Sequence, residues 1–357
     1  MRVVHVDSAR GWRGGQNQAL LTALGMAARG HDVTVACQAG GTLAERARAA
    51  GLAVRELAFR GDLSPTAVLA LAAAMRESRP DVVQLHDPHA VSAGLLARRL
   101  AGPAALVATR RVDFALRGPL SRRKYAACDR VIAVSQAIAG VLGRGGLAAE
   151  RVRVVYEGVP DRSALPGGRE ALRDLGIPED APVVGNVAAL TGHKDQATLL
   201  EAAAKVVTRV PEARFVIVGE GELRGRLEAR SRDLGLERRC VFAGFRADLD
   251  RLIPAFTVFC LSSHMEGLGT SLLDAMAFGV PVVATAAGGI PEAVQDGITG
   301  RLAPPRQPDA LAAALLEALD DPGRRAAWGR AGRRRYEERF TADRMIDATL
   351  AVYAELS

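Results

Sequence analysis

The sequence predicts an α/β protein made of two Rossmann-like domains, each with a doubly wound parallel sheet, that face a cleft. Short β-rich runs recur at intervals of roughly 20 to 30 residues, with Ala/Leu/Arg-rich helical stretches between them. Many of these runs are continuously apolar, which is typical of parallel strands covered by helices on both faces. The 357 residues also exceed what one hydrophobic core usually organises, so two domains are expected.

The expected strands form two series, separated by a break in composition. Residues 156–170, YEGVPDRSALPGGRE, contain two prolines and three glycines and are typical of a linker. We therefore expect one domain over residues 1–160 and a second over residues 170–335. The first series of strands covers 2–7, 32–37, 53–57, 81–86, 105–110, 130–135 and 151–156, and the second covers 182–187, 214–219, 240–245, 257–262 and 281–286.

The net charge of +7 favours anionic partners, such as phosphates or an acidic membrane surface. A solvated basic face explains the dense basic segment between residues 98 and 130, and attraction to anionic lipid is the alternative interpretation. Nucleic acid is not expected as a partner, because aromatic residues, on which bases stack, make up only 4% of the chain. The basic residues of the segment are Arg98, Arg99, Arg110, Arg111, Arg117, Arg122, Arg123, Lys124 and Arg130.

The four cysteines, Cys37, Cys128, Cys240 and Cys260, are far apart and form no C-x-x-C pair. They are expected to be small buried hydrophobes in a reducing compartment. The chain opens directly on a strand pattern, so no signal peptide is expected. The longest apolar run, 66–75, is far shorter than the ~20 residues of a membrane span. We therefore expect a cytoplasmic protein, with peripheral attachment at the inner face of the membrane as the lipid hypothesis requires.

In doubly wound sheets ligands bind beyond the carboxyl ends of the strands, so functional residues are expected in the loops after the strands. The loop after the first strand carries Gly14 and Gly15 just before a helix, where free amides favour an anion. A plain tight turn is the alternative. An NAD site is not expected, because the glycines do not follow G-x-G-x-x-G and the second strand ends in Cys37 and Gln38 rather than an acid.

His86, Asp87 and His89 follow the fourth strand of the first series. They suggest a metal at first sight, but alternate residues of an extended turn rarely converge without a further ligand. A substrate-side hydrogen-bonding or proton-handling His86 and a structural histidine both remain open. Acids at 247–250 are expected to cap a helix, and the glycines of 219–225 are expected to allow a turn.

His193 and Lys194 lie between the strand at 182–187 and a helix. A lysine there offers a mobile positive charge for a phosphate. The dipole of the following helix disfavours a cation at this end, so an anionic partner is expected nearby.

The stretch EGLGTSLLDAMAFGVP, 266–281, places an acid on each side of a glycine-rich helix start. The amides of residues 269 to 271 are expected to point toward a diphosphate. Glu266 precedes the helix, while Asp274 lies one turn inside it, on the same face as Thr270, where it can accept hydrogen bonds from a diol. The alternative is that Glu266 caps the helix and Asp274 is surface charge.

These residues carry a family signature. The chain resembles the GT-B-fold retaining glycosyltransferases of family 4, the glycosyl transferases group 1, over essentially its full length. The stretch from Glu266 to Thr285 with G-G-I-P-E at 288–292 is similar to the family's E-x7-E motif and its trailing strand and turn. Supporting matches are R-G-H-D-V at 29–33, V-I-A-V-S at 131–135, V-G-E-G-E-L at 218–223 and V-F-A-G-F at 241–245.

The resemblance implies transfer of a sugar from a nucleotide-diphosphate sugar to an acceptor hydroxyl with retained configuration, without an essential metal or other cofactor. The domain of residues 1–160 would face the acceptor, 170–335 would hold the donor, and a helix of residues 336–357 would cross back to the first domain. The implied catalytic residues are Glu266, for the sugar hydroxyls, Lys194, for the diphosphate, and His86, facing the acceptor. The implied donor-binding residues are Gly14, Gly15, His193, Arg246 near the base, Leu268, Gly269, Thr270, Ser271 and Asp274 at the ribose.

Three positions depart from the family pattern. The second acid is Asp274 rather than Glu, and Ala189 stands where many members have Arg, so His193 is expected to share the charge of Lys194. Arg111 stands where many members have His. Arg110 and Arg111 are therefore expected on the acceptor side, where an arginine could bind an anionic group.

The expected partners are a nucleotide-sugar donor, with UDP-, GDP- and ADP-sugars as the ones to test, and a glycan or glycolipid acceptor of cell-envelope synthesis such as polysaccharide or lipopolysaccharide. An anionic membrane surface is a further expected partner. The alternatives are a nucleotide-sugar-binding protein with a decayed site and a GT-B sugar-nucleotide epimerase.

Overall fold

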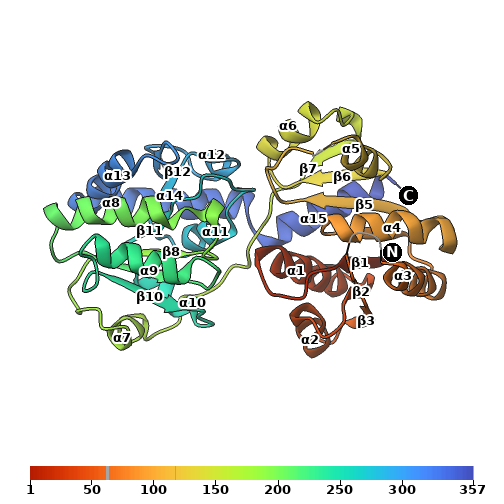
Figure 1. Ribbon diagram of the computed structural model, residues 1–357, viewed down its shortest axis with the longest axis horizontal. Coiled ribbons are helices and arrows are strands. Elements are labelled where there is room, and N and C mark those ends of the chain that lie inside the picture. Colours follow the sequence, from red (N-terminus) through yellow and green to blue (C-terminus); the bar gives the residue numbers. More distant parts are fainter. Residues whose placement is uncertain (62–63, 117, 357) are drawn as a thin grey trace. The chain divides into compact units, whose positions relative to one another are not determined.

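The computed structural model describes residues 1–61, 64–116 and 118–356, and it forms two compact units (Figure 1). The first unit comprises Met1–Gly158 and Ala342–Ser357, and the second comprises Val159–Thr341. Each unit is a parallel sheet with helices on both faces, so two doubly wound domains are present as the sequence predicts.

The first unit contains a seven-stranded parallel sheet in the order β3-β2-β1-β4-β5-β6-β7. The chain moves outward from β1 to β3, returns to β4 beside β1, and then moves outward in the other direction. The bounds are β1 (Arg2–Asp7), α1 (Gly14–Ala28), β2 (Asp32–Gln38), α2 (Thr42–Ala49), β3 (Ala53–Leu57), α3 (Pro65–Ser78), β4 (Val82–Leu85), α4 (Pro88–Ala101), β5 (Ala105–Arg110), α5 (Gly118–Ala126), β6 (Arg130–Ala133), α6 (Gln136–Arg144), β7 (Val152–Val154) and α15 (Ala342–Ala354).

The second unit contains a six-stranded parallel sheet in the order β10-β9-β8-β11-β12-β13. It has the same reversal of direction, here between β8 and β11. The bounds are α7 (Gly168–Asp174), β8 (Val183–Val187), α8 (Gln196–Arg209), β9 (Arg214–Val218), α9 (Arg224–Asp233), β10 (Cys240–Gly244), α10 (Leu249–Leu252), β11 (Val258–Leu261), α11 (Thr270–Ala277), β12 (Val282–Thr285), α12 (Ile290–Ala293), β13 (Gly300–Ala303), α13 (Pro308–Asp320) and α14 (Pro322–Arg339).

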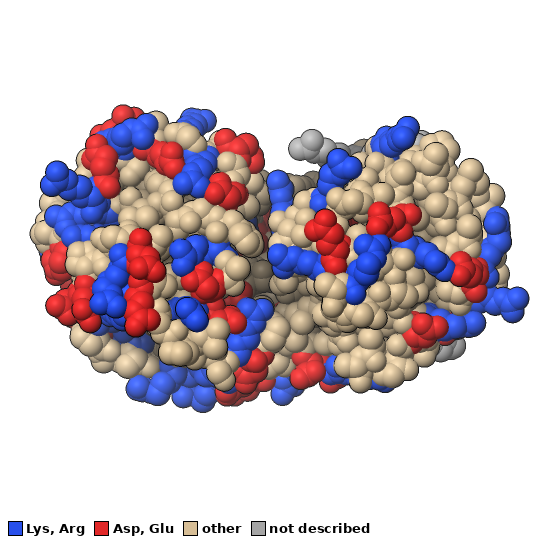
Figure 2. All heavy atoms as spheres, turned by 90° about the horizontal axis from the view of Figure 1, so that it is seen from below, with Lys and Arg blue, Asp and Glu red and all other residues tan. Residues whose placement is uncertain are grey.

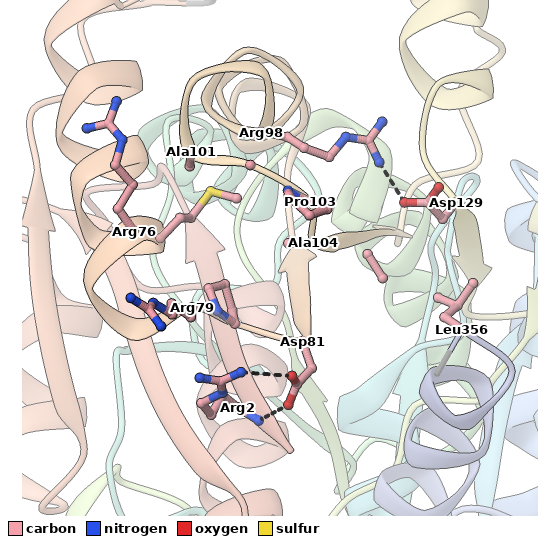
Figure 3. Close-up of a pocket in the computed structure, with 14 residues that line it drawn as sticks. Arg2, Arg76, Arg79, Asp81, Arg98, Ala101, Pro103, Ala104, Asp129 and Leu356 are labelled. Carbon is pink, nitrogen blue, oxygen red and sulfur yellow. Dashed lines mark hydrogen bonds and ion pairs between the residues drawn. The ribbon is translucent and has the colours of Figure 1, made fainter.

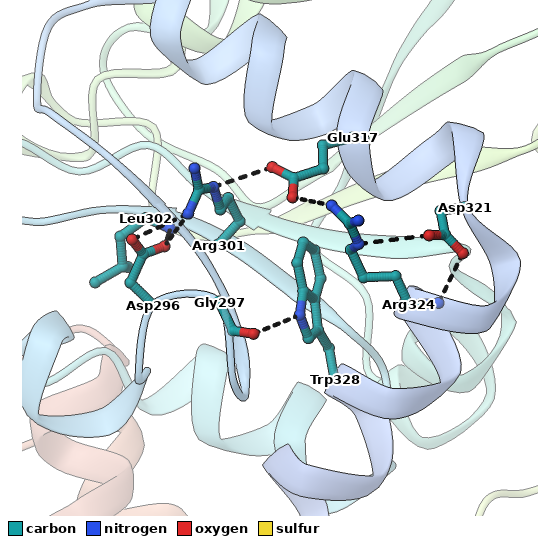
Figure 4. Close-up of polar contacts among 8 residues, drawn as sticks. All are labelled: Asp296, Gly297, Arg301, Leu302, Glu317, Asp321, Arg324 and Trp328. Atoms are coloured by element: carbon teal, nitrogen blue, oxygen red, sulfur yellow. Dashed lines mark hydrogen bonds and ion pairs between the residues drawn. The ribbon is translucent and has the colours of Figure 1, made fainter.

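All the expected strands are present, within two residues at each end, but the sequence analysis missed β13. This edge strand has four residues and includes a glycine and an arginine, so it lacks an apolar pattern. Side chains hold it in place (Figure 4): Asp296 accepts hydrogen bonds from the amide of Leu302 at 2.9 Å and from Arg301, and Arg301 also pairs with Glu317 of α13. The strand therefore depends on tertiary contacts rather than on local propensity.

The helix expected to cross back over residues 336–357 is two helices. Residues up to Thr341 belong to the second unit, where α14 ends at Arg339, and α15 begins at Ala342 in the first unit. The two helices are separated at the buried Phe340, which has φ -125°, and Val159 pairs with Thr341 in an isolated bridge. Only α15 therefore returns to the first unit.

Alternate residues of the strands serve the two faces of the first sheet. Val4 and Val6 of β1 pack with α3 and α4, while Val3 packs with α1 and α15. Gly25 of α1 lets α15 approach closely, since a Cβ there would lie 2.0 Å from Cδ1 of Ile346. Burial on both faces is the physical reason that these strands are continuously apolar. The four cysteines are buried and free, as expected, and burial raises the pKa of the Cys37 thiol to about 12.

Acidic and basic side chains are interspersed over the face seen in Figure 2. The segment 98–130 likewise does not form one basic face. Arg98 and Arg130 pair with Asp129 and Glu355, while Arg110 is buried. Arg117 lies outside the described residues. The exposed basic residues of the segment are Arg99, Arg122 and Arg123.

Candidate functional site

Each sheet has a topological switch point, where neighbouring strands are followed by helices on opposite faces. In the second unit the switch lies between β8 and β11, because the chain runs outward from β8 to β10 before it returns to β11. The loops after these two strands, 188–195 and 262–269, carry Lys194 and Glu266. The two residues that the sequence analysis placed at the diphosphate and the sugar therefore lie at the position where doubly wound sheets bind ligands.

The side chains of Lys194 and Glu266 form an ion pair between Nζ and Oε2. The lysine side chain is 18% exposed and the glutamate side chain 12% exposed, so the pair is mostly buried but still accessible. Ser263 donates to the same carboxylate oxygen at 3.1 Å. Glu266 is thus the anionic partner that the lysine at this helix start requires. The sequence indicated that a partner exists, but not which residue it is.

Two hydrogen bonds hold the loops together. The hydroxyl of Ser262 donates to the carbonyl of Lys194 at 3.0 Å, and the amide of His264 donates to the carbonyl of His193 at 3.0 Å. His193 itself lies beside Thr191, with Nδ1 3.2 Å from its hydroxyl. Asp195 caps α8 by accepting from the amide of Thr198 at 3.4 Å, and it also accepts from the hydroxyl of Thr198 at 2.8 Å. The ion pair therefore lies on a loop pair whose backbone is fixed.

The G-G-I-P-E turn supports Glu266 from behind. The amide of Gly289 donates to the carbonyl of Glu266 at 3.1 Å. Gly288 has φ +50°, and a Cβ at this position would lie 1.9 Å from that same carbonyl oxygen. Only glycine fits here, which explains the first glycine of G-G-I-P-E.

The start of α11 is the expected phosphate position. Gly269, at φ +92°, precedes the helix and offers no side chain to cap it. The side chains of Thr270 and Ser271 are half-buried, whereas Leu268 is fully buried. Leu268 can therefore face a ligand only with its backbone, while the first amides of α11 stay free of a side-chain cap and point out of the helix.

Asp274 lies one turn into α11 and is half-buried. Burial raises the pKa of its carboxyl to about 6, opposed by the charge of Arg162 and reinforced by that of Asp250. Arg162 pairs with Asp250 at 2.9 Å. Asp274 is therefore not free surface charge, and Glu266 does not cap α11, whose start has no side-chain cap. The linker residue Arg162 is a neighbour that sequence reasoning missed.

The expected cap at 247–250 is wrong in detail. Asp248 precedes α10, but its side chain makes no cap and instead binds Arg246 through two hydrogen bonds of 2.8 and 2.7 Å. Arg246 is thereby held in a fixed orientation. The glycines of 219–225 were expected to allow a turn, and Gly219 has a positive φ of +138°. A Cβ at Gly219 or Gly221 would also meet the backbone of the loop after β8, at 2.0 and 2.3 Å.

In the first unit the switch point lies between β1 and β4, and His86 follows β4. Its Nε2 lies 3.0 Å from Nδ1 of His5, and its Nδ1 lies 3.1 Å from a terminal nitrogen of Arg111. Because arginine can only donate, Nδ1 of His86 accepts and its proton lies on Nε2. Burial lowers the pKa of His86 well below its usual value and that of His5 to about 3.

His86 is therefore a neutral histidine with both ring nitrogens occupied. Of the two interpretations left open by the sequence, this geometry favours the structural one. What His86 positions is Arg111, whose Nε also donates to Glu157 at 2.9 Å. Glu157 lies in the stretch taken as a linker, where nothing local marks it as a partner of Arg111.

The start of α1 lies against the same cluster. A Cβ on Gly15 would lie 3.7 Å from Cδ of Arg111, and Gly14 is exposed. Gln16 donates to both carboxylate oxygens of Asp7, at 3.2 and 3.0 Å. Burial raises the pKa of Asp7. The sequence analysis did not name Asp7 or Gln16 as candidate site residues. A polar residue at the end of an apolar strand, such as Asp7, could have indicated a site residue.

Arg110 turns away from this cluster. It is 7% exposed, donates to the hydroxyl of Tyr125 at 3.3 Å and to the carbonyl of Phe114 at 2.5 Å, and lies over the Tyr125 ring. Its role in this geometry is to fix the segment before α5. Of the two arginines expected on the acceptor side, Arg111 alone lies at the switch point.

The histidine and aspartate residues after β4 do not gather around one point. Asp87 caps α4 through the amides of His89 and Ala90 and binds Ser8. Within residues 1–61, 64–116 and 118–356, no group of three His, Cys, Asp or Glu side chains converges as metal ligands would. In the same described part of the chain, the helices fall short of the length and apolar character of a membrane span.

Each unit matches a family model. Residues 12–162 match Glycosyltransferase Family 4, and residues 169–335 match Glycosyl transferases group 1. Fold and sequence agree: each unit matches a glycosyltransferase domain model, and the chain has the GT-B fold.

Similar solved structures cover both units. Anabaena Alr3699/HepE in complex with UDP-glucose is 26% identical, with a TM-score of 0.86 over 99% of this chain and 100% of that chain. A glycosyltransferase from Rickettsia africae ESF-5 is 19% identical, with a TM-score of 0.87 over 99% of this chain and 98% of that one. The second likeness is one of fold alone.

Curated relatives match over part of their length. The GDP-mannose-dependent alpha-(1-6)-phosphatidylinositol monomannoside mannosyltransferase of Mycolicibacterium smegmatis is 36% identical over 177 residues, 47% of this chain and 46% of the relative. The D-inositol 3-phosphate glycosyltransferase of Kribbella flavida is 35% identical over 215 residues, 57% of this chain and 50% of the relative. The matches span about half the length of these relatives.

Proposed function

We propose that the protein transfers a sugar from a nucleotide-diphosphate sugar to an acceptor hydroxyl, with retention of configuration. The observation that carries this proposal is the half-buried Lys194–Glu266 pair at the switch point of the second sheet, beside the uncapped start of α11. The pair combines a cation for a diphosphate with a carboxylate for sugar hydroxyls, at the end of the sheet where such ligands bind.

Donor binding exchanges partners in this pair. The diphosphate takes over Lys194, and the carboxylate of Glu266 becomes free to accept hydrogen bonds from the sugar. Charge on the leaving diphosphate is then neutralised by Lys194 and the amides of Thr270 and Ser271, without a metal or other cofactor in the proposal. Ser263 keeps Glu266 oriented during the exchange.

In the transfer step the bond from the anomeric carbon to the diphosphate oxygen breaks, and the bond to the acceptor oxygen forms on the same face. The acceptor proton passes to the departing phosphate oxygen. No protein nucleophile takes part, in agreement with the neutral, fully bonded state of His86. Asp274 accepts hydrogen bonds from the ribose hydroxyls, and Arg246 lies at the base.

The acceptor in this proposal is a glycan or glycolipid of the cell envelope. Two relatives act, by their names, on a phosphatidylinositol mannoside and an inositol phosphate, and both acceptors are anionic. In the first unit, Phe114 and Leu120 are 42% and 80% exposed beside Arg122 and Arg123 of α5. Apolar and basic groups together suit an anionic membrane surface.

Lys194→Ala tests the donor site, with Lys205→Ala as the matched control because Lys205 is an exposed lysine of the same unit. Binding of UDP, UDP-glucose and GDP-mannose is measured by calorimetry, and transfer is measured by product analysis. We expect Lys194→Ala and Glu266→Ala to abolish transfer, while Lys205→Ala retains it. Full transfer by either site variant would refute the site.

The same assays separate the alternatives. A protein with a decayed site binds a nucleotide sugar but neither transfers nor hydrolyses it, and an epimerase changes the sugar without any acceptor. The membrane contribution is measured by sedimentation with vesicles that contain anionic lipid. Phe114→Ser with Leu120→Ser is expected to reduce co-sedimentation and to leave nucleotide binding unchanged.

A further inference from the structure

The first unit contains a cavity of about 1200 Å³ at the amino-terminal ends of its strands (Figure 3). The His86–Arg111 cluster lies at the opposite, carboxyl ends. The cavity lies where strands begin: Arg2 opens β1, Asp81 precedes β4, Ala105 opens β5 and Asp129 precedes β6. His86 and Arg111 follow the carboxyl ends of β4 and β5. The cavity is therefore separate from both switch-point clusters.

The lining of the cavity carries excess positive charge. Arginines outnumber aspartates by four to two among its charged side chains. Arg76 and Arg79 come from the end of α3, and Arg98 comes from the last turn of α4, so three cations approach from two helices. These arginines also compensate the carbonyl ends of the helices, which accounts for part of their charge.

The two aspartates are already engaged. Asp81 accepts from the amide and the guanidinium of Arg2, at 2.7 and 3.3 Å, and Asp129 accepts from Arg98 at 2.7 Å and from the amide of Leu106 at 2.8 Å. Bonds to Arg2 lower the pKa of Asp81, so this carboxyl is ionised at neutral pH. The aspartates are thus used to position Arg2 and Arg98 and the strand starts.

Arg76 and Arg79 have no comparable partner. Arg76 donates from Nε and one terminal nitrogen to the carbonyl of Leu100, at 3.3 and 3.2 Å, which leaves its other terminal nitrogen available. In the described part of the chain, no carboxylate lies within ion-pair distance of either Arg76 or Arg79. Arg76 and Arg79 are thus two exposed guanidinium groups on the lining of the same cavity, and each guanidinium can bind a phosphate through paired hydrogen bonds.

Apolar groups form the rest of the lining. Met75 is buried, and Ala101, Pro103, Ala104 and Leu356 complete the surface beside the arginines. A cavity whose lining combines arginines with apolar groups suits a phosphate that is carried on a larger body.

We propose that this cavity is a second anion site, which binds a phosphate or diphosphate group carried by a small phosphorylated molecule or by a lipid headgroup. Its occupant joins the ends of α3 and α4 to the starts of β1, β4 and β6, and so stabilises the first unit. The site goes beyond the proposed sugar transfer, and it does not depend on donor binding in the second unit.

Calorimetry with pyrophosphate tests the proposal on the full chain. Lys194→Ala is used as the background, so that the proposed donor site contributes little. Adding Arg76→Gln and Arg79→Gln is expected to weaken pyrophosphate binding by about tenfold or more, since two charge-assisted contacts are lost. The matched control adds Arg99→Gln and Arg144→Gln, two exposed arginines of the same unit that do not line the cavity.

Equal pyrophosphate affinity in the cavity variant and the control, or no binding in the background protein, would overturn the proposal. Arg79→Gln alone serves if the double change impairs folding. A further variant keeps Lys194 and carries only Arg76→Gln and Arg79→Gln. We expect this variant to bind UDP as the parent protein does, so that failure of the cavity site can be told apart from failure of the donor site.

The source of the phosphate is distinguished with vesicles of phosphatidylcholine, with and without phosphatidic acid. Binding to the acidic vesicles that is lost in the cavity variant, but not in the control, assigns the site to a lipid headgroup. Pyrophosphate binding that follows the cavity arginines without such vesicle binding assigns it to a soluble phosphate.

Discussion

Replacing Asp274 by Asn removes a half-buried carboxyl group whose pKa is raised to about 6. In the unfolded chain the pKa of an aspartate is about 3.9. Because the folded state binds the proton more tightly, it holds more protons than the unfolded state between these two values. The free energy of unfolding therefore falls as the pH rises from about 4 to 6.

The folded and unfolded pKa values of Asp274 differ by about two units, and each unit corresponds to about 1.4 kcal/mol. Ionisation of Asp274 therefore lowers the free energy of unfolding of the second unit by about 3 kcal/mol at pH 7.5. Asn carries no charge at any of these pH values. We expect Asp274→Asn to be more stable than the parent protein by about 2–3 kcal/mol at pH 7.5 and nearly equal to it at pH 4. The attraction between the carboxylate and Arg162 is already contained in the net pKa shift.

Urea denaturation at pH 4, 5, 6 and 7.5 measures this difference. The chain has two tryptophans, Trp12 in the first unit and Trp328 in the second, so a Trp12→Phe background reports unfolding of the second unit alone. Asp309→Asn is the control, because Asp309 is an acid of the same unit with its side chain 83% exposed. Parallel stability curves for Asp274→Asn and the parent across this pH range would show that burial does not govern this carboxyl.

Three further outcomes are expected. Asp274→Glu should be tolerated, while Asp274→Ala should mainly weaken donor binding measured by calorimetry; loss of turnover with intact affinity would contradict the ribose role. Gly288→Ala should destabilise the second unit more than Gly297→Ala does, and the difference should be at least about 2 kcal/mol. Both glycines have a positive φ, but only a Cβ at Gly288 would meet a backbone oxygen. Equal losses in denaturation would contradict the steric argument. Glu157→Gln should lower the stability of the first unit by about 1–3 kcal/mol, because a buried guanidinium loses its carboxylate; unchanged Trp12 fluorescence melts would refute it.

The clearest limits on sequence reasoning come from single elements. The strands of both sheets were predictable because burial on two faces leaves a continuous apolar run, which is a local property. β13 was not, since its four residues are held by Asp296 and by side chains of α13 rather than by their own pattern. Residues 336–357 show the same effect, as the amphipathic pattern continues through the point at which the chain passes from one unit to the other.

The candidate site divides in a similar way. The sequence predicted that Lys194, Glu266, Gly269 and Asp274 lie in the loops and at the helix start that follow two strands, and the dipole of α8 predicted an anion near Lys194. The identity of that anion was not available from spacing, since Lys194 and Glu266 are far apart in the chain and meet only when β8 and β11 pair.

By itself, then, the sequence determined two doubly wound units, their strand positions and the loops that carry polar chemistry, because periodicity and composition are local. The tertiary structure decided the state of each group: the neutral His86 between His5 and Arg111, the raised pKa of Asp274, and the cavity of arginines at the strand starts. These depend on which distant segments become neighbours and on how much water they exclude, and neither quantity is a property of a stretch of sequence.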